Sequence, residues 1–246
     1  MTVEFCLPVY NEESILKKNI LLLLEYCRAA RFDFAWSITI AVNGSGDKSL
    51  EICRELQEKY PQEVKVKNFA ASGKGAAIIN SCLESRAEII VYMDIDLSAS
   101  LEDLPALIKA LDDGYDLTIG SRLLPGSKTD RSFIRNLSSK SYNWFSRLIL
   151  KHDLTDLQCG FKACRTEAFK KIAPFIKDNN WFFDTELIFF AYYLGYKVKE
   201  IPISWSENKY QQRKSKIRLV SDSLVFIRNL LALKARADQL PKLKHV

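Results

Sequence analysis

Residues that build structural metal sites are scarce in this sequence. Its 246 residues include two histidines, His152 and His245, and six scattered cysteines, no two of which have C-x-x-C spacing. A structural zinc site needs four such ligands at short spacings, so none is predicted. The cysteines are expected to be reduced, mostly buried thiols, as in a cytosolic protein.

Long hydrophobic runs are also missing. No stretch of 18 or more uncharged apolar residues occurs, so no transmembrane helix is expected. Residues 1–5 lack a basic leader and a cleavage site, which predicts no signal peptide. Apolar residues make up 48% and charged residues 27% of the chain, a balance that excludes a disordered protein.

Two common nucleotide-binding motifs are absent. The glycines of Gly73-Lys74-Gly75 do not have the G-x-x-x-x-G-K-[ST] spacing of a P-loop, which disfavours a P-loop NTPase. No G-x-G-x-x-G follows the first predicted strand, which disfavours a dinucleotide-dependent dehydrogenase. The Gly-Lys-Gly segment alone fits either a phosphate-binding loop or a simple turn.

The net charge of +6 is concentrated toward the C-terminal end. Residues 208–246 hold ten Lys and Arg against two Asp, a balance of +8, which leaves 26 basic and 28 acidic residues in the first 207. A basic tail favours an anionic partner such as lipid or phosphate, although a solvated helix face has the same composition. Nucleic acid is not predicted as a partner, because no binding motif accompanies the charge.

Apolar residues alternate between strand and helix periods over the first 120 residues. Strands are predicted near 3–7, 36–42, 64–69, 88–93 and 115–120. Helices follow the strands, and Asn11 is expected to cap the first helix. The alternation predicts an α/β fold with a mainly parallel, doubly wound sheet and helices on both faces. Further along, helices are predicted near 131–150, 166–175, 183–194 and 215–236, and strands near 160–164 and 197–205.

Unusual residues follow the predicted strands. Ligands of open parallel sheets bind beyond the carboxyl ends of the strands, so segments 8–13, 43–47, 71–75 and 94–96 should meet at one edge. Asp94 and Asp96, two residues apart at the end of a buried strand, can both face a divalent cation. Mg²⁺ or Mn²⁺ prefers such carboxylates together with substrate phosphates. The alternative is that a strand-end carboxylate caps the next helix.

An ordered set of motifs resembles a known family. The motifs are LPVYNEE at 7–13, GKG at 73–75, MDIDLS at 93–98, GSR at 120–122, QCGFK at 158–162, WFFDTEL at 181–187 and IPISW at 201–205. They resemble the inverting family 2 glycosyltransferases with a GT-A fold, in particular the dolichyl-phosphate and polyprenyl-phosphate glucosyl- and mannosyltransferases. The resemblance covers about residues 3–220 and implies one domain over 1–246. Its parts would be a nucleotide-sugar half (1–120), an acceptor half (121–207) and a basic amphipathic segment (208–246).

The resemblance also implies roles for individual residues. The donor, of UDP-glucose or GDP-mannose type, would contact Pro8, Tyr10, Glu12, Asn43, Gly73, Lys74 and Asp94. The metal, Mg²⁺ or Mn²⁺, would be held by Asp94, Asp96 and Ser98. The acceptor phosphate would contact Arg122, Arg131, Arg135, Lys162, Arg213 and Lys216, and the catalytic set would be Asp94, Asp96, Asp184 and Arg122. Relatives commonly carry Asp where this chain has Asn43, which leaves the choice of nucleotide base open.

The type of acceptor follows from proton chemistry. A hydroxyl acceptor must lose a proton to a positioned base, whereas a phosphate monoester is already ionised and needs cations to hold it. Arginine suits that task through bidentate contact with phosphate, although Arg131 and Arg135 also fit a solvated helix face. Asp184 and Glu186 could orient sugar hydroxyls, provide a base for a hydroxyl acceptor, or only complement a helix dipole.

The expected function is therefore transfer of a hexose from a nucleotide-sugar to a polyprenyl or dolichyl phosphate. The final predicted helix pairs an apolar face with basic residues, which suits either an anionic membrane surface or packing on the domain. The expected location is peripheral, at the cytosolic face of a membrane, and a membrane-spanning partner protein is left open. The alternatives are a family 2 enzyme acting on a glycan or other hydroxyl, and a non-catalytic membrane- or phosphate-binding module.

Overall fold

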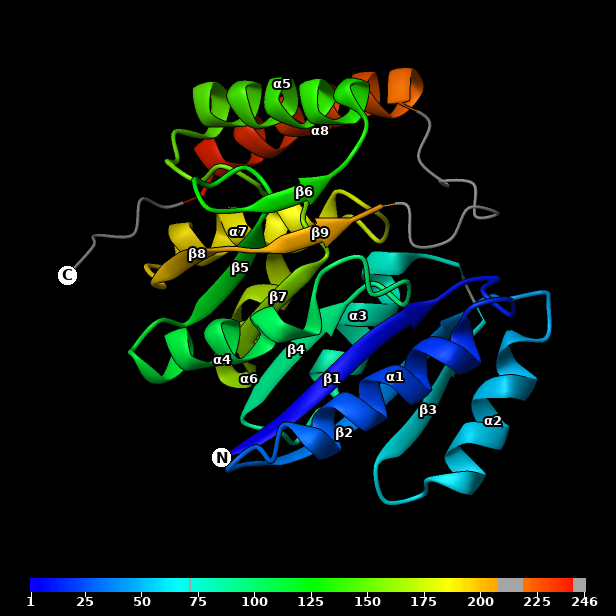
Figure 1. Cartoon of the computed structure of the whole chain (residues 1–246). Coiled ribbons are helices and arrows are strands. Elements are labelled where there is room, and N and C mark those ends of the chain that lie inside the picture. The colour runs from blue at the N-terminus through cyan, green and yellow to red at the C-terminus, as the bar shows by residue number, and fades with distance from the viewer. Residues whose placement is uncertain (71, 208–218, 241–246) are drawn as a thin grey trace.

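The computed structural model describes residues 1–70, 72–207 and 219–240. A seven-stranded sheet of order β3-β2-β1-β4-β7-β5-β8 forms its centre, and β6 and β9 form a second sheet (Figure 1). The strands are β1 (Thr2–Val9), β2 (Ala35–Asn43), β3 (Val64–Phe69), β4 (Ile89–Met93), β5 (Leu117–Ser121), β6 (Lys128–Asp130), β7 (Phe161–Arg165), β8 (Val198–Pro202) and β9 (Ser204–Ser206). The helices are α1 (Leu16–Ala29), α2 (Ser49–Lys59), α3 (Lys74–Leu83), α4 (Leu104–Asp112), α5 (Phe133–Leu150), α6 (Thr166–Ile172), α7 (Phe183–Tyr193) and α8 (Leu219–Asp238), with short 3-10 turns at Leu101–Asp103 and Ala173–Phe175.

The sheet confirms the predicted α/β class. Strands β1 to β4 pair in parallel, as does β5 with β8, while β7 runs antiparallel between β4 and β5. Because β7 comes from the second half of the chain and its neighbours from the first, the two halves share one sheet. All five residues of β4 are buried, as its continuous apolar run predicts for a central strand.

Two local predictions were wrong, and one strand was missed. The single strand expected over 197–205 is two strands in different sheets, because the chain turns at Ile203, whose N–H donates to Ser121 O while its carbonyl accepts from Lys128 N. The second sheet pairs β9 in parallel with β6, a three-residue strand that the period did not indicate. Asn11 does not cap α1, which starts at Leu16; it has a positive φ of 51° and accepts a hydrogen bond from Gly46 N.

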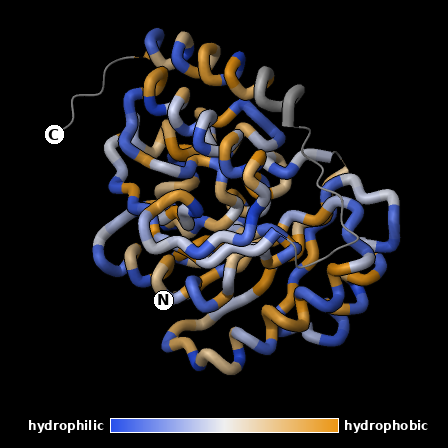
Figure 2. The backbone as a smooth tube through the Cα atoms, turned by 45° about the horizontal axis from the view of Figure 1, so that its top comes forward, coloured by the Kyte–Doolittle hydropathy of each residue, from blue (hydrophilic) through white to orange (hydrophobic). Residues whose placement is uncertain are grey.

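Helices cover both faces of the sheet. One hydrophobic cluster joins the sheet to α1, α2 and α4, and a second joins it to α3, α6, α7 and part of α8. Hydrophilic and hydrophobic segments alternate along the outer helices, as expected for elements that bury one face (Figure 2). Helices α5 and α8 pack side by side at one end of the molecule (Figure 1). In the part of the chain that the structure describes, no helix has the length and apolar character needed to cross a membrane.

All six cysteines are buried and unpaired, which confirms that they form no disulfide framework. Burial in apolar surroundings raises the pKa of Cys27 and of Cys53 to about 12, so both are protonated thiols near neutral pH. Thiols of this kind act as small hydrophobic core residues rather than as nucleophiles.

Candidate active site

The loops after β1 and β2 are tied together by hydrogen bonds. Asn11 accepts from Gly46 N at 2.8 Å, and its own N–H donates to Ser45 Oγ at 3.0 Å. The Glu12 N–H donates to Ser49 Oγ at 2.9 Å. These contacts hold the predicted donor residues in place: Pro8, Glu12 and Asn43 are buried, and Tyr10 is exposed beside them.

The chain turns sharply after β4 and presents the two predicted metal-binding carboxylates. The turn closes through Leu97 N and Asp94 O at 3.0 Å, and Leu97 adopts a φ of 50°. Asp96 accepts a hydrogen bond from Ser98 N at 3.0 Å. Strand β7 braces the same turn, because Asp94 N donates to Gly160 O at 3.2 Å. Asp94 and Ser98 line one small cavity with Gly160 and Trp205.

Lys74 connects the Gly-Lys-Gly segment to the end of β4. Its Nζ lies 2.5 Å from Asp94 Oδ1 and 4.8 Å from the ring centre of Trp181. Burial opposes the charge of Lys74, but Asp94, Asp184 and Asp96 outweigh it and raise the pKa of the ammonium group. Gly160 leaves the room for this contact, because a Cβ there would overlap Asp94 Oδ2 and lie 2.9 Å from Lys74 Nζ.

The carboxylates after β4 fit a divalent cation that also binds substrate. Asp94 and Asp96 lie in one turn, and the Lys74 ammonium contacts Asp94 Oδ1, so a metal ion bound there would share the Asp94 carboxylate with Lys74. The described residues hold no cluster of three or more His, Cys, Asp or Glu that could enclose a metal. Two carboxylates with open positions are the ligand set of Mg²⁺ or Mn²⁺ sites completed by phosphates and water.

Lys162 and Asp184 form a fully buried pair. Lys162 Nζ contacts Asp184 Oδ1 and donates to Cys159 O, and Tyr92 Oη donates to the same Asp184 oxygen at 2.7 Å. The Lys162 side chain is 0% exposed and that of Asp184 is 3% exposed. The structure therefore separates Lys162 from the predicted phosphate-binding arginines, and both charges of the pair are neutralised inside the core.

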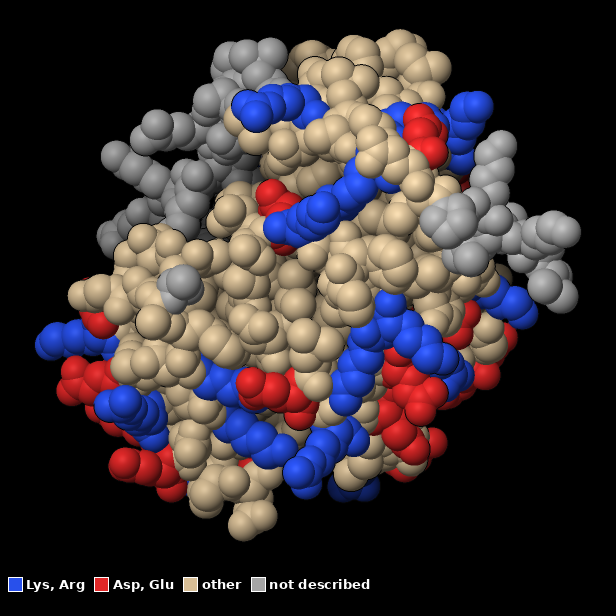
Figure 3. Space-filling view, turned by 180° about the vertical axis from the view of Figure 1, so that it is seen from behind, with Lys and Arg blue, Asp and Glu red and all other residues tan. Residues whose placement is uncertain are grey.

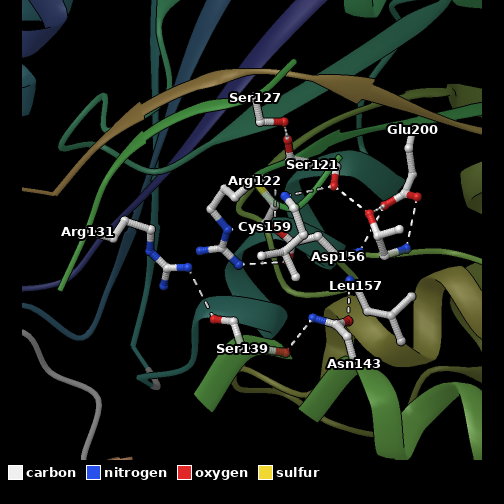
Figure 4. A network of polar contacts seen from close by, with 12 residues as sticks. Ser121, Arg122, Ser127, Arg131, Ser139, Asn143, Asp156, Leu157, Cys159 and Glu200 are labelled. Atoms are coloured by element: carbon white, nitrogen blue, oxygen red, sulfur yellow. Dashed lines mark hydrogen bonds and ion pairs between the residues drawn. The ribbon is translucent and has the colours of Figure 1, made fainter. Parts of the chain in front are cut away.

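Arg122 is held in a bidentate contact with Asp156 (Figure 4). Its Nε and Nη2 lie 2.7 and 2.8 Å from the two Asp156 oxygens, and its backbone N–H donates to the same carboxylate. Burial opposes ionisation of Asp156, but Arg122 outweighs it and lowers the pKa of the carboxyl. Glu200 Oε1 fixes the segment by accepting from Asp156 N at 2.9 Å. The guanidinium carbon lies 4.9 Å from the ring centre of Trp205.

Arg131 and Arg135 share the carboxylate of Glu207. Arg131 Nε lies 2.6 Å from Glu207 Oε1, and Arg135 Nη1 lies 3.0 Å from Oε2. Arg131 also donates to Ser139 Oγ at 3.2 Å, which links the segment after β6 to α5 (Figure 4). Burial and the charge of Arg122 lower the pKa of Arg131, so the three arginines form one positively charged cluster.

The predicted metal-binding residues and the predicted phosphate-binding arginines thus form two neighbouring groups. Asp94, Asp96, Ser98 and Lys74 surround the end of β4, while Arg122, Arg131 and Arg135 lie beyond β5 and β6. Trp205 links the groups, since it lines the cavity with Asp94 and lies beneath Arg122. The predicted residues Arg213 and Lys216 lie outside the described residues.

Sequence reasoning missed Glu207, Glu200 and Ser139. Glu207 is 76 positions from Arg131 and Glu200 is 44 from Asp156, so no local spacing connects either pair. Glu186, considered as a possible base, instead accepts hydrogen bonds from Lys177 N and Asp178 N at 2.7 Å and contacts Arg236. It fixes the loop before α7 and connects that loop to α8.

The chain belongs to glycosyl transferase family 2, whose family model matches residues 4–173. A glycosyltransferase AglD of Haloferax volcanii is 31% identical over 90% of this chain, and a dolichyl-phosphate β-glucosyltransferase ALG5D of Trichomonas vaginalis is 32% identical over 83%. The chain spans 35% and 66% of these two relatives, respectively. A dolichol-phosphate mannosyltransferase of Pyrococcus furiosus is 28% identical over 98% of this chain and 67% of its own length.

The fold resembles that of solved GT-A structures. Glucosyl-3-phosphoglycerate synthase of Mycobacterium tuberculosis, in complex with Mn²⁺, UDP and phosphoglyceric acid, superposes with a TM-score of 0.67 at 14% identity. The match covers 98% of this chain and 79% of the synthase. Sequence, family model and fold agree on a family 2 glycosyltransferase with the GT-A architecture.

Proposed function

We propose that this chain transfers a hexose from a nucleotide-sugar to a polyprenyl or dolichyl phosphate. The observation that carries the proposal is the arginine cluster beside the Asp94–Asp96 turn. Arg122, Arg131 and Arg135 offer planar, bidentate donors of the kind that bind phosphate. Relatives named as dolichyl-phosphate glucosyltransferase and dolichol-phosphate mannosyltransferase support the same acceptor class, with a donor of UDP-glucose or GDP-mannose type.

The charged carboxylates beside the cluster argue against a hydroxyl acceptor. Asp184 is buried against Lys162, and Asp156 is held by Arg122, which lowers its pKa. Neither is suited to removing a proton from a hydroxyl, because a general base must be near the acceptor and have a pKa near the working pH. An ionised phosphate oxygen needs no base. Attack by that oxygen on the anomeric carbon breaks the bond to the diphosphate, which leaves with the bonding electrons, and inverts the sugar.

The chain's own residues divide this work. Pro8, Tyr10 and Asn43 border the nucleotide, and Lys74 supplies a cation for the diphosphate beside Gly73. Asp94 and Asp96, with Ser98 in the same turn, would hold Mg²⁺ or Mn²⁺, which would neutralise charge on the leaving diphosphate. Mn²⁺ and UDP in the mycobacterial synthase support this assignment.

Asp184 has a positioning role in this scheme. It holds Lys162, whose Nζ donates to Cys159 O, and the residue after Cys159, Gly160, packs against Asp94. The buried pair therefore fixes the floor of the site on which the Asp94 and Lys74 side chains rest.

Matched acceptors test the proposal. Purified protein with Mn²⁺ is given labelled UDP-glucose or GDP-mannose, together with either farnesyl phosphate or farnesol, which differ only in the phosphate. We expect one donor to be used, with labelled lipid formed from farnesyl phosphate and none from farnesol. Equal transfer to farnesol would move the protein to the hydroxyl-acceptor class. No binding of either nucleotide-sugar would favour the non-catalytic module.

An exposed apolar surface at one end of the molecule supports a lipid acceptor, and its largest described part lies on α5, although Leu231 (56%) of α8 is exposed as well. In α8, Leu230 and Leu233 are buried in the core, and Phe226 packs on Tyr142 and Phe182. The outward face of α5 instead exposes large apolar side chains: Phe133 (80%), Leu137 (55%), Trp144 (54%) and Leu148 (64%). In the view from behind, uncharged side chains form the top of the molecule between basic ones at its margins, whereas charges of both signs crowd the opposite end (Figure 3).

We infer that this apolar face rests on an anionic membrane. Exposed Lys140, Arg147 and Lys151 lie on or directly after α5, so basic side chains flank the apolar ones, as in helices that lie in a membrane surface. The same helix carries Arg135 and Ser139, and the arginine cluster therefore lies next to the surface from which a lipid-linked phosphate would enter. The proposed location is the cytosolic face of a membrane, with or without a membrane-spanning partner protein.

A double variant tests the membrane face. Trp144→Ser with Leu148→Ser is expected to weaken binding to vesicles containing phosphatidylserine at least about tenfold, because burial of each side chain contributes about 1.5–3 kcal/mol. Co-sedimentation with the vesicles measures the change. The control is Leu22→Ser with Leu83→Ser, which removes two side chains, each 42% exposed, from α1 and α3. Equal binding by both double variants would show that α5 is not the membrane contact.

A further inference from the structure

Glu207 is positioned by the small second sheet. Strands β6 and β9 pair in parallel with Asp130 opposite Ser206, so Arg131 and Glu207, which follow these strands, come together. The backbone of Glu207 is anchored as well, because its N–H donates to Asp130 O at 3.1 Å. Its carboxylate bridges Arg131 at 2.6 Å and Arg135 at 3.0 Å. The Glu207 carboxylate thus pairs with two of the arginines proposed to bind the acceptor phosphate.

The two carboxylates of the cluster are held differently. Asp156 is 0% exposed, accepts from both the side chain and the backbone of Arg122, and is fixed in turn through Glu200. Glu207 is 13% exposed and meets the arginines at the end of a longer side chain, next to Arg135, which is 32% exposed. Asp156 is therefore the more firmly held counterion, and Glu207 is the carboxylate of the cluster that is nearer to solvent.

The buried positive charge of Arg131 requires a nearby anion. Arg131 is 6% exposed and lies near Arg122, and both effects oppose its positive charge. A buried cation without an anionic partner is strongly destabilising. The cluster consequently needs an anion when no acceptor is bound, and it needs that anion to leave when a phosphate arrives.

We propose that Glu207 is an internal competitor of the acceptor phosphate that sets the balance between substrate binding and product release. The inference rests on the proposed acceptor. A phosphate monoester carries nearly two negative charges near neutral pH, whereas the glycosylated product is a phosphodiester with one. Glu207, with a single charge, yields the arginines to the dianionic substrate and competes on equal terms with the monoanionic product. A neutral hydroxyl offers no charge in exchange.

The test compares Glu207→Gln, which keeps the shape and removes the charge, with the unaltered chain. Calorimetry measures the affinity for farnesyl phosphate, a dianionic monoester, and for its methyl diester, which is monoanionic. The two ligands have the same farnesyl chain. We expect the variant to bind both ligands more tightly, each on the order of tenfold, because either ligand must displace the Glu207 carboxylate from the arginines. In steady state, KM for farnesyl phosphate falls, product inhibition strengthens by a similar factor, and kcat falls because the product leaves more slowly.

Two further variants serve as controls for this test. Glu63→Gln removes a carboxylate that contacts Arg28 at 2.6 Å far from the cluster, and it should change none of these quantities. Glu207→Asp keeps the charge but shortens the side chain, which weakens its contacts with the two arginines. It should bind both ligands more tightly than the unaltered chain, and unchanged binding overturns the inference if Glu207→Gln does not fold. Unchanged affinity of Glu207→Gln for both farnesyl phosphate and its methyl diester overturns the inference and leaves the acceptor proposal standing. Failure of the unaltered chain to bind farnesyl phosphate overturns both.

Discussion

Asp96→Ala is expected to reduce sugar transfer by about two to three orders of magnitude while leaving the fold intact. Charge develops on the diphosphate as it departs, and removal of one group that stabilises such charge typically costs about 10²–10³ in kcat. Asp96 lies in a turn closed by other contacts, including Leu97 N to Asp94 O, so the turn does not depend on its side chain alone. Initial rates with saturating donor and farnesyl phosphate measure the loss.

Two comparisons make this result specific. Asp112→Ala removes an exposed carboxylate at the end of α4 and should leave the rate within about twofold of the unaltered chain, since substitutions at such positions usually have small effects. Titration with Mn²⁺ in the presence of UDP should show weakened metal-dependent nucleotide binding for Asp96→Ala. A variant that transfers sugar at nearly the native rate would remove the Asp94–Asp96 turn from the proposed mechanism.

The features that the sequence predicted correctly depend on residues adjacent in the chain. The run Ile89–Met93 followed by Asp94 and Asp96 indicates a buried strand that ends in carboxylates, and the structure has this arrangement. Strand direction is different: the apolar run around Phe161–Arg165 predicts a strand but carries no information on polarity, which is antiparallel here. The division of 197–205 depends on pairing of β9 with β6, a partner about 75 residues earlier that only the folded chain supplies.

The charged side chains show the same limit. Arg131 and Arg135 were expected from the family resemblance to hold phosphate, but the resemblance does not indicate which carboxylate balances them in the free protein. Likewise, α5 and α8 both have amphipathic sequences, and the choice of outward face depends on packing. Leu230 and Leu233 of α8 lie in the core, whereas Leu231 of α8 and Trp144 and Leu148 of α5 are exposed. The local sequence pattern predicts which helix or strand a residue belongs to. Contacts between distant parts of the chain then determine what its side chain does.

The second large expected effect is a loss of stability when Asp184 is replaced. Asp184→Ala is expected to lower the free energy of unfolding by about 3–5 kcal/mol, because it leaves the Lys162 ammonium buried without its anion. Urea denaturation measures the change. The exposed pair Lys17–Glu55, at 3.2 Å, supplies the control: Glu55→Ala should cost at most about 1 kcal/mol, since solvent screens that pair.

A double variant distinguishes the buried charge from other roles of Asp184. Lys162→Met with Asp184→Asn removes both charges and keeps an acceptor for Tyr92 Oη, so it should regain most of the stability lost in Asp184→Ala. If Asp184 only positions the floor of the site, the double variant should also regain much of the transfer rate, since the introduced methionine side chain would fill the space that Lys162 occupies. An Asp184→Ala protein as stable as the unaltered chain yet inactive would instead assign Asp184 to the reacting groups.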